Sequence, residues 1–247
     1  MVIELKTQAE LDGLREAGAV VAAALGAVVR AARVGTRGDE LDELARSVLD
    51  EAGAVPLDRR AGSRPLPCAI SCSVNDVVVG GRPGSRRLVS GDVLSLACGL
   101  RLQGWCSGAA VSVVVGRAGE ADAALLSTTG QALQDGIAAA HPGGRLGDVA
   151  HAVGVVGRSA GYGIPARLGR DRQEAVLVAN DGAAGRGAPL RPGLVLAIGP
   201  VFLAGGRDRV RTDAEGSAVR TDDGSRAAHV EHTVAITEQG PRVLTLP

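Results

Sequence analysis

The chain opens with apolar residues at helical spacing. Thr7 and Glu10 form a T-x-x-E pattern, which predicts a capping box at the start of a helix over about residues 7–33. The apolar stripe of this helix consists of Leu11, Leu14, Ala17, Val21, Leu25 and Val28. A second helix is expected to begin near Thr36 and to end at Gly53.

The pattern then changes from helical to extended. A loop rich in Pro, Gly and Arg is expected over residues 56–67. Runs of β-branched and apolar residues follow it, separated by turn residues. They predict strands over residues 69–74, 77–79, 93–100 and 110–115.

The second half of the chain repeats the order of the first. Helices are expected over residues 121–140 and 146–160. Strands are expected over residues 175–179, 194–198, 209–212, 230–236 and 243–246. Two helices followed by a β-section, twice, predict an α+β fold with an internal pseudo-twofold repeat, in one domain over residues 1–247.

Composition narrows the possible functions. The 247 residues carry 27 basic and 27 acidic side chains, so no net charge draws the chain to nucleic acid or to an anionic membrane. One Trp, one Tyr and one Phe leave few aromatic rings on which bases could stack. We therefore expect neither a nucleic-acid nor a membrane partner, and we expect the local Arg clusters to be solvated loops or a partner surface.

The four cysteines and the N-terminal segment bear on location. No basic segment followed by an apolar run opens the chain, and the apolar run over residues 17–29 is shorter than the roughly 20 residues that span a bilayer. Four cysteines without a secretory signal favour reduced thiols. The sequence thus predicts a cytoplasmic protein.

Short motifs spread along the chain carry a family resemblance. They are residues 15–18 (REAG), 75–78 (NDVV), 91–93 (GDV), 190–193 (LRPG), 230–234 (VEHTV) and 244–246 (LTL). In order and spacing this set resembles the type I methionine aminopeptidases, which belong to peptidase family M24. The resemblance implies a pita-bread fold and a site that binds two divalent metals such as Co, Mn, Fe or Zn.

The family holds its metals with two Asp, one His and two Glu, and most of the matching positions differ here. The Asp positions are Ala97 and Gly108, the His of a Gly-His-Gly turn is Tyr162, and the Glu before a Pro is Gly199. Only the Glu of the Glu-His-Thr motif remains, as Glu231. One carboxylate cannot replace the several oxygen or nitrogen ligands that each ion needs.

Other positions of the family site differ as well. Its two auxiliary histidines match Gly80 and, in a loop that aligns less closely, Gly169. The aromatic residues of the methionine pocket are replaced by residues near Ser63, Leu66, Leu168 and Ser217. Trp105, Tyr162 and Glu231 are expected to line the ligand groove that remains.

These substitutions lead to our first functional hypothesis. We expect an inactive relative of the aminopeptidases that needs no cofactor and binds a peptide or protein partner through the former substrate groove. Without metals, Glu231 is expected to be protonated more easily or to pair with His229, an Arg or water. Tyr162 is expected either to fill the vacated space or to donate a hydrogen bond to a ligand.

An enzyme is the alternative hypothesis. Under it, the chain removes N-terminal methionine, or hydrolyses another substrate, through a rebuilt metal site. Cys106, His229 and Glu231 could point into one cavity and bind zinc, which accepts S, N and O ligands. The alternative to a zinc site is a structural role, in which Cys106 is a small buried residue and His229 a polar strand residue.

Overall fold

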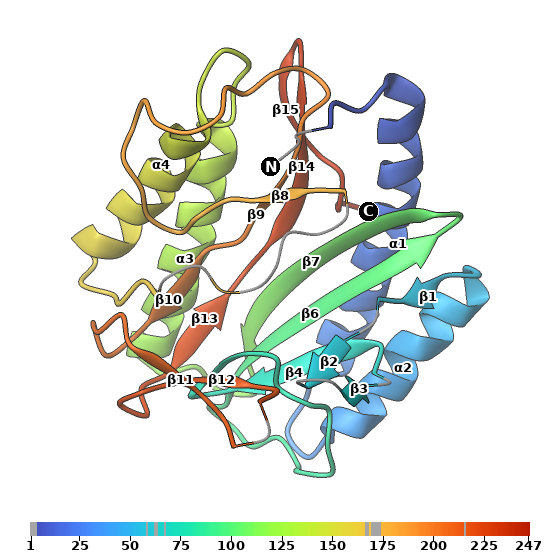
Figure 1. Ribbon diagram of the computed structural model, residues 1–247. Helices are drawn as coiled ribbons and strands as arrows, with labels where there is room; N and C mark the ends of the chain where they lie inside the picture. The colour runs from blue at the N-terminus through green and yellow to red at the C-terminus, as the bar shows by residue number, and fades with distance from the viewer. Residues whose placement is uncertain are drawn as a thin grey trace.

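Four long helices flank the strands in two pairs. The computed structural model describes residues 4–57, 59–61, 64–66, 68–165, 168, 174–214 and 216–247. Helices α1 (Gln8–Ala31) and α2 (Gly38–Glu51) form one pair, and α3 (Glu120–Ala138) and α4 (Leu146–Ser159) form the other. Figure 1 shows the pairs on opposite sides of the molecule with the strands between them. The predicted capping box of α1 is confirmed, with reciprocal bonds between Thr7 and Glu10.

A four-stranded antiparallel sheet belongs to the first half of the chain. It contains β1 (Val55–Pro56), β4 (Ile70–Val74), β6 (Val93–Leu102) and β7 (Trp105–Val114). The long β6–β7 hairpin is in register from Val93–Val114 to Leu102–Trp105. Its residues pack against α1 and α2 in a cluster built from small and branched aliphatic side chains.

A second four-stranded sheet belongs to the other half. Its order is β15 (Gly240–Val243), β14 (His232–Thr237), β9 (Val195–Ile198) and β8 (Val176–Leu177). It packs against α3 and α4 in a second cluster that contains the single Phe, Phe202. Two helices covering a sheet in each half confirm the α+β fold with an internal repeat.

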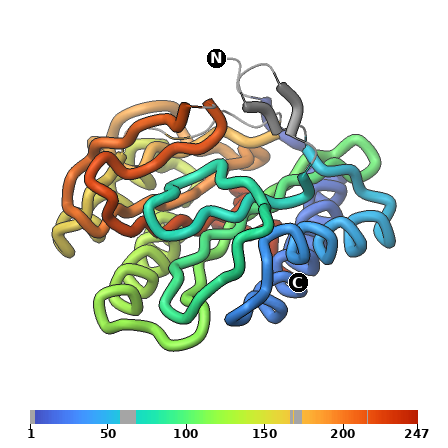
Figure 2. The backbone as a smooth tube through the Cα atoms, turned by 90° about the horizontal axis from the view of Figure 1, so that it is seen from below, coloured from blue at the N-terminus to red at the C-terminus, as the bar shows by residue number. Residues whose placement is uncertain are grey.

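Shorter strands complete the fold. The pair β10 (Val201–Leu203) and β13 (Ala227–His229) follows the second sheet, and β11 (Val210–Thr212), β12 (Val219–Thr221) and β5 (Val77–Val79) form another small sheet. A hairpin of β2 (Arg59–Ala61) and β3 (Arg64–Leu66) lies where a loop was predicted. Viewed from below in Figure 2, the chain curves from the blue N-terminal helices round to the orange and red C-terminal strands.

The two large sheets meet at one isolated pair of residues. Ala110 of β7 forms an antiparallel bridge with Glu231, which immediately precedes β14. The strand that was predicted over residues 230–236 corresponds to β14, which begins only at His232, after the bridge; β13 lies before the predicted range. The Ala110–Glu231 bridge therefore joins the sheet of the first half of the chain to the sheet of the second half.

No helix of the described residues is long and apolar enough to cross a bilayer.

Candidate functional site

Glu231 stands at the centre of the candidate site. Its backbone N–H donates to the Ala110 carbonyl at 2.9 Å, and the Ala110 N–H donates back at 3.0 Å. The side chain is buried, with Oε2 at 3.7 Å from Nε2 of His229. The expected pairing of Glu231 with His229 is therefore confirmed.

Gly199 lies directly beside this carboxylate. It follows β9, whose last residue Ile198 pairs with His232 of β14. A Cβ atom added to Gly199 would lie 3.1 Å from both Cγ and Oε2 of Glu231. The backbone thus brings the two positions of the family's glutamate ligands into contact, although only one carries a side chain.

The two former aspartate positions face the same region. Ala97 pairs directly with Ala110 across the β6–β7 hairpin, and directly paired residues of antiparallel strands point to the same face. Gly108 precedes Ala110 by two residues and therefore shares that face as well. Its carbonyl accepts a hydrogen bond from Thr233 Oγ1 at 2.8 Å. Ala97, Gly108, Gly199 and Glu231 therefore meet on one face, as their motifs predict.

Tyr162 follows α4 and packs on the strand that comes after Gly199. Its ring stacks on Phe202 of β10, with the ring centres 6.1 Å apart and the planes at 24°. The bridge between Gly163 and Leu203 holds the turn against the same strand. This contact supports the interpretation in which the tyrosine ring fills space.

The auxiliary positions form no polar site among the described residues. Gly80 adopts φ +77° and packs against the carbonyl oxygen of Ser217 so closely that a Cβ would overlap it. Leu168 packs at the edge of an apolar cluster around Val78 and Leu203. Gly169 and Ser63, and the side chain of Leu66, lie outside the described part.

Trp105 does not line the groove, and this prediction is wrong. Odd and even positions of β7 face opposite sides, so Trp105 points away from Gly108. Its indole packs against Gly13 of α1, and Nζ of Lys6 lies 5.7 Å from the ring centre. The residue anchors the N-terminal segment and the first helix.

Cys106 does not join His229 and Glu231. It shares the face of Ala110, but four residues of extended strand place their Cα atoms about 13 Å apart. Among the described residues, no three His, Cys, Asp or Glu side chains are grouped so that they could hold a metal ion. The predicted zinc triad is therefore not formed.

Polar contacts that the sequence did not indicate hold the chain on both sides of Glu231, at His229 and at His232. Ser112 Oγ accepts from the His229 N–H at 2.9 Å and donates to the His229 carbonyl at 2.8 Å. On the other side, His232 Nδ1 lies 2.8 Å from Thr245 Oγ1. Burial lowers the pKa of His232, and the opposing effect of the Glu231 charge does not cancel this shift. Serine within an apolar strand was the one available sign of the Ser112 contact.

The paired helices, the two sheets joined at Glu231 and the internal repeat define the pita-bread fold. This class is shared by solved structures with low sequence identity, including a prolidase from Pyrococcus furiosus at a TM-score of 0.74 and 17% identity, covering 98% of this chain and 65% of that one. The match to metallopeptidase family M24 covers residues 12–238. The chain belongs to this family, and within it to the type I methionine aminopeptidases.

Relatives align with almost the full chain. Methionine aminopeptidase 1 of Mycobacterium tuberculosis is 43% identical, covering 99% of this chain and 96% of its own length. Methionine aminopeptidase 1 of Bacillus subtilis is 36% identical, with 99% of both chains covered. The crystal structure of the Thermotoga maritima methionine aminopeptidase matches at a TM-score of 0.91 and 32% identity, over 100% of both chains.

These comparisons correct the first functional hypothesis. We expected an inactive binding protein without a cofactor, but the relatives that match along the whole chain are methionine aminopeptidases, in a family of metallopeptidases. Nothing in the comparisons indicates loss of activity, and they favour a divalent metal as cofactor. Membership of the family therefore favours a metal-dependent aminopeptidase, whereas the side chains at positions 97, 108, 162 and 199 differ from the family's metal ligands.

Proposed function

We propose that the chain is an aminopeptidase that removes methionine from the N-terminus of peptides, with a divalent metal as its cofactor. The observation that carries the proposal is the 43% identity with a methionine aminopeptidase over 99% of the chain. The conserved backbone arrangement around Glu231 supports it, because Ala97, Gly108 and Gly199 still converge on that residue.

The side chains described at this position do not fit the family's pair of metals. His229 and Glu231 offer one nitrogen and one carboxylate, whereas divalent ions in proteins take at least four ligands each. Three further carboxylates, Asp58, Asp171 and Glu215, fall outside the described residues. We therefore assign no step of the reaction to a metal, and the proposal rests on the relatives.

The chain's own residues suggest how a peptide is held. The substrate of an aminopeptidase carries a positive α-ammonium group, and the Glu231 carboxylate supplies a negative charge in a largely buried setting. Gly199 has no side chain, and the Glu231 side chain takes the space beside it. In the proposal, Glu231 binds the peptide's N-terminus and His229, held through its backbone by Ser112, orients the carboxylate.

The test is methionine release from a Met-Ala-Ser peptide in the presence of Co²⁺, Mn²⁺ or Zn²⁺. Glu231→Gln is expected to reduce release by about 30-fold or more, since removing one partner of a buried pair of charges costs about 2 kcal/mol or more. Glu238→Gln, an exposed glutamate in the turn after β14, removes the same charge and should leave release unchanged. Equal rates for wild type and Glu231→Gln would contradict the assigned role of Glu231.

A further inference from the structure

Two exposed valines from distant segments lie side by side near the turn between α1 and α2. Val34 in this turn is 58% exposed, and Val89, shortly before β6, is 50% exposed. The Gly35 N–H donates to the Leu88 carbonyl at 2.8 Å, so one hydrogen bond joins the peptide units that adjoin both valines. Accessible aliphatic carbon is therefore concentrated at this point of the surface.

Three exposed arginines surround the valines. Arg33 precedes Val34 in the chain, and Nη1 of Arg87 donates to the carbonyl of the residue after Val34, at 2.8 Å. Arg117 comes directly after a glycine whose Cβ, if one were added, would lie 3.1 Å from Cγ2 of Val34. These five residues are called the valine patch below: Arg33, Val34, Arg87, Val89 and Arg117.

The positive charge of the valine patch is not neutralised within the described part of the chain. No carboxylate there forms an ion pair with any of its three arginines. The carboxylates close by are engaged elsewhere, because Asp92 is bound to Arg86 and the acids at the start of α2 are bound to Arg37. Glu120, the next acidic residue after Arg117, is exposed. The patch therefore carries an excess of positive charge in a chain whose net charge is zero.

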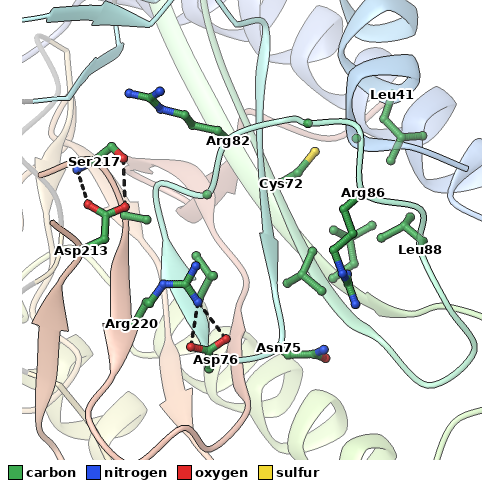
Figure 3. A pocket seen from close by; sticks show the side chains of 17 residues that line it. Leu41, Cys72, Asn75, Asp76, Arg82, Arg86, Leu88, Asp213, Ser217 and Arg220 are labelled. Carbon is green, nitrogen blue, oxygen red and sulfur yellow. Dashed lines mark hydrogen bonds and ion pairs between the residues drawn. The ribbon is translucent and has the colours of Figure 1, made fainter. Parts of the chain in front are cut away.

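The neighbouring cavity differs from the valine patch in both charge and access. Figure 3 shows this cavity beside residues 81–88, with Arg220 bound to Asp76 and with Leu41 and Leu88 in its wall. The charge of Arg220 is thus neutralised, and both leucines are at most 3% exposed. Unpaired arginines and accessible apolar carbon occur together in the valine patch and not in this cavity.

An acidic segment with aliphatic side chains matches the valine patch. Guanidinium groups bind carboxylates through charge-assisted hydrogen bonds, and the two valines are stabilised when another aliphatic side chain removes them from water. A nucleic acid fits less well, because its bases stack on aromatic rings and the patch contains none. An anionic membrane also fits less well, because the chain as a whole carries no net charge that would draw it to such a surface.

We propose that the valine patch docks an acidic, extended segment of a partner protein, with carboxylates of the segment on the three arginines and an aliphatic side chain across the two valines. The surface is independent of the proposed aminopeptidase activity. It lies beside α1 and α2, which pack on Leu96 and Cys98 of β6, whereas Ala97 between them faces the opposite side.

The test is fluorescence anisotropy of a labelled peptide, Asp-Glu-Val-Leu-Glu-Asp, titrated with the full chain. It is expected to bind at least about tenfold more tightly than Lys-Lys-Val-Leu-Lys-Lys, and about tenfold more weakly in about 500 mM than in about 50 mM salt, because salt screens exposed charges. Replacing Val-Leu by Ala-Ala in the acidic peptide should weaken binding by about threefold. No binding of the acidic peptide, or equal binding of the acidic and basic peptides, would overturn the proposal.

Variants at exposed positions locate the surface without disturbing the core. Arg117→Glu should weaken binding of the acidic peptide by about fivefold, whereas Arg186→Glu, in the exposed loop after β8, should not. Val34→Ser should weaken it by about threefold, and Val155→Ser, at a position of α4 that is 47% exposed, is the matched control. Binding unchanged by both Arg117→Glu and Val34→Ser would place the peptide elsewhere and overturn the proposal.

Vesicles that contain phosphatidylserine distinguish a protein partner from a lipid surface. Binding of the acidic peptide, with no sedimentation of the chain on the vesicles, supports the proposal. Sedimentation that Arg117→Glu abolishes, with no binding of the acidic peptide, would assign the valine patch to a membrane and overturn the proposal.

Discussion

Gly199 and Glu231 lie so close together that the one constrains the other. A Cβ at Gly199 would approach Cγ and Oε2 of Glu231 to 3.1 Å, a distance shorter than most real Cβ contacts. The contact follows from the pairing of β9 with β14, which sets the residue after Ile198 beside the residue before His232. The lack of a side chain at position 199 thus gives the Glu231 carboxylate its present place.

Gly199→Ala is expected to destabilise the protein through this contact. The added methyl group must displace a buried carboxylate that is paired with His229, and overpacking of this kind costs about 1–3 kcal/mol. Urea unfolding of the variant measures the loss as a lower midpoint at an unchanged slope.

The matched control for this prediction is the same change without the carboxylate. In a Glu231→Ala background, Gly199→Ala should cost about 1 kcal/mol less than in the wild type, since contacting residues show coupling energies of this order. Strictly additive effects of the two substitutions would show that the contact does not limit position 199.

Asp92 is expected to make stability depend on acidity. Burial raises its pKa, but hydrogen bonds from Arg86, the Val89 N–H and Asn75 outweigh this and lower the pKa below the usual 3.8. A carboxylate whose pKa is lower in the folded chain stabilises it above pH 3.8, and this contribution is lost as the pH falls below 3.8 through the folded value. Acid should therefore reduce the free energy of unfolding.

Asp92→Asn tests this dependence. It should lower the free energy of unfolding by about 1–3 kcal/mol at pH 7 and make its decline below pH 4 shallower. Asp50→Asn changes an exposed aspartate of α2 and serves as the control. Parallel acid profiles for the wild type and Asp92→Asn would refute the role given to Asp92.

Two glycines of α1 are expected to respond in opposite ways to alanine. A Cβ at Gly18 would overlap the carbonyl oxygen of Leu244, because the helix packs directly on the C-terminal segment. At Gly26 the nearest atom is the flexible end of Arg30, at 3.3 Å. Thermal or urea unfolding should show a loss of about 1–3 kcal/mol for Gly18→Ala and a gain of about 0.5–1 kcal/mol for Gly26→Ala. A gain at both positions would contradict the packing of α1 on the C-terminal segment.

The helices could be predicted because their causes are local, while several strand features could not. The capping box and apolar stripe of α1 lie within its own sequence. The turn between β6 and β7 was missed because Gln103 takes φ +48°, a conformation that is unusual for glutamine, before Gly104. The break at Glu231 depends on its pairing with Ala110, 121 positions away in the chain, and no local pattern records it.

The site was predicted in position but not in every side chain. Motif context correctly brought Ala97, Gly108, Gly199 and Glu231 to one face. Trp105 was misplaced although its odd position in β7, opposite in parity to Gly108, already excluded it from that face. The zinc prediction placed Cys106 on the correct face of β7. The face of a strand does not fix the distance along it, and Cys106 lies too far from His229 and Glu231.

The most direct test of the proposed function is metal content together with methionine release. The account predicts that the wild-type chain, incubated with Co²⁺, Mn²⁺ or Zn²⁺, retains at least about one equivalent of metal and releases methionine from Met-Ala-Ser. A variant that carries Ala97→Asp, Gly108→Asp, Tyr162→His and Gly199→Glu restores the family's ligands and serves as the positive control. Metal binding and methionine release by that variant, with neither in the wild type, would contradict the account.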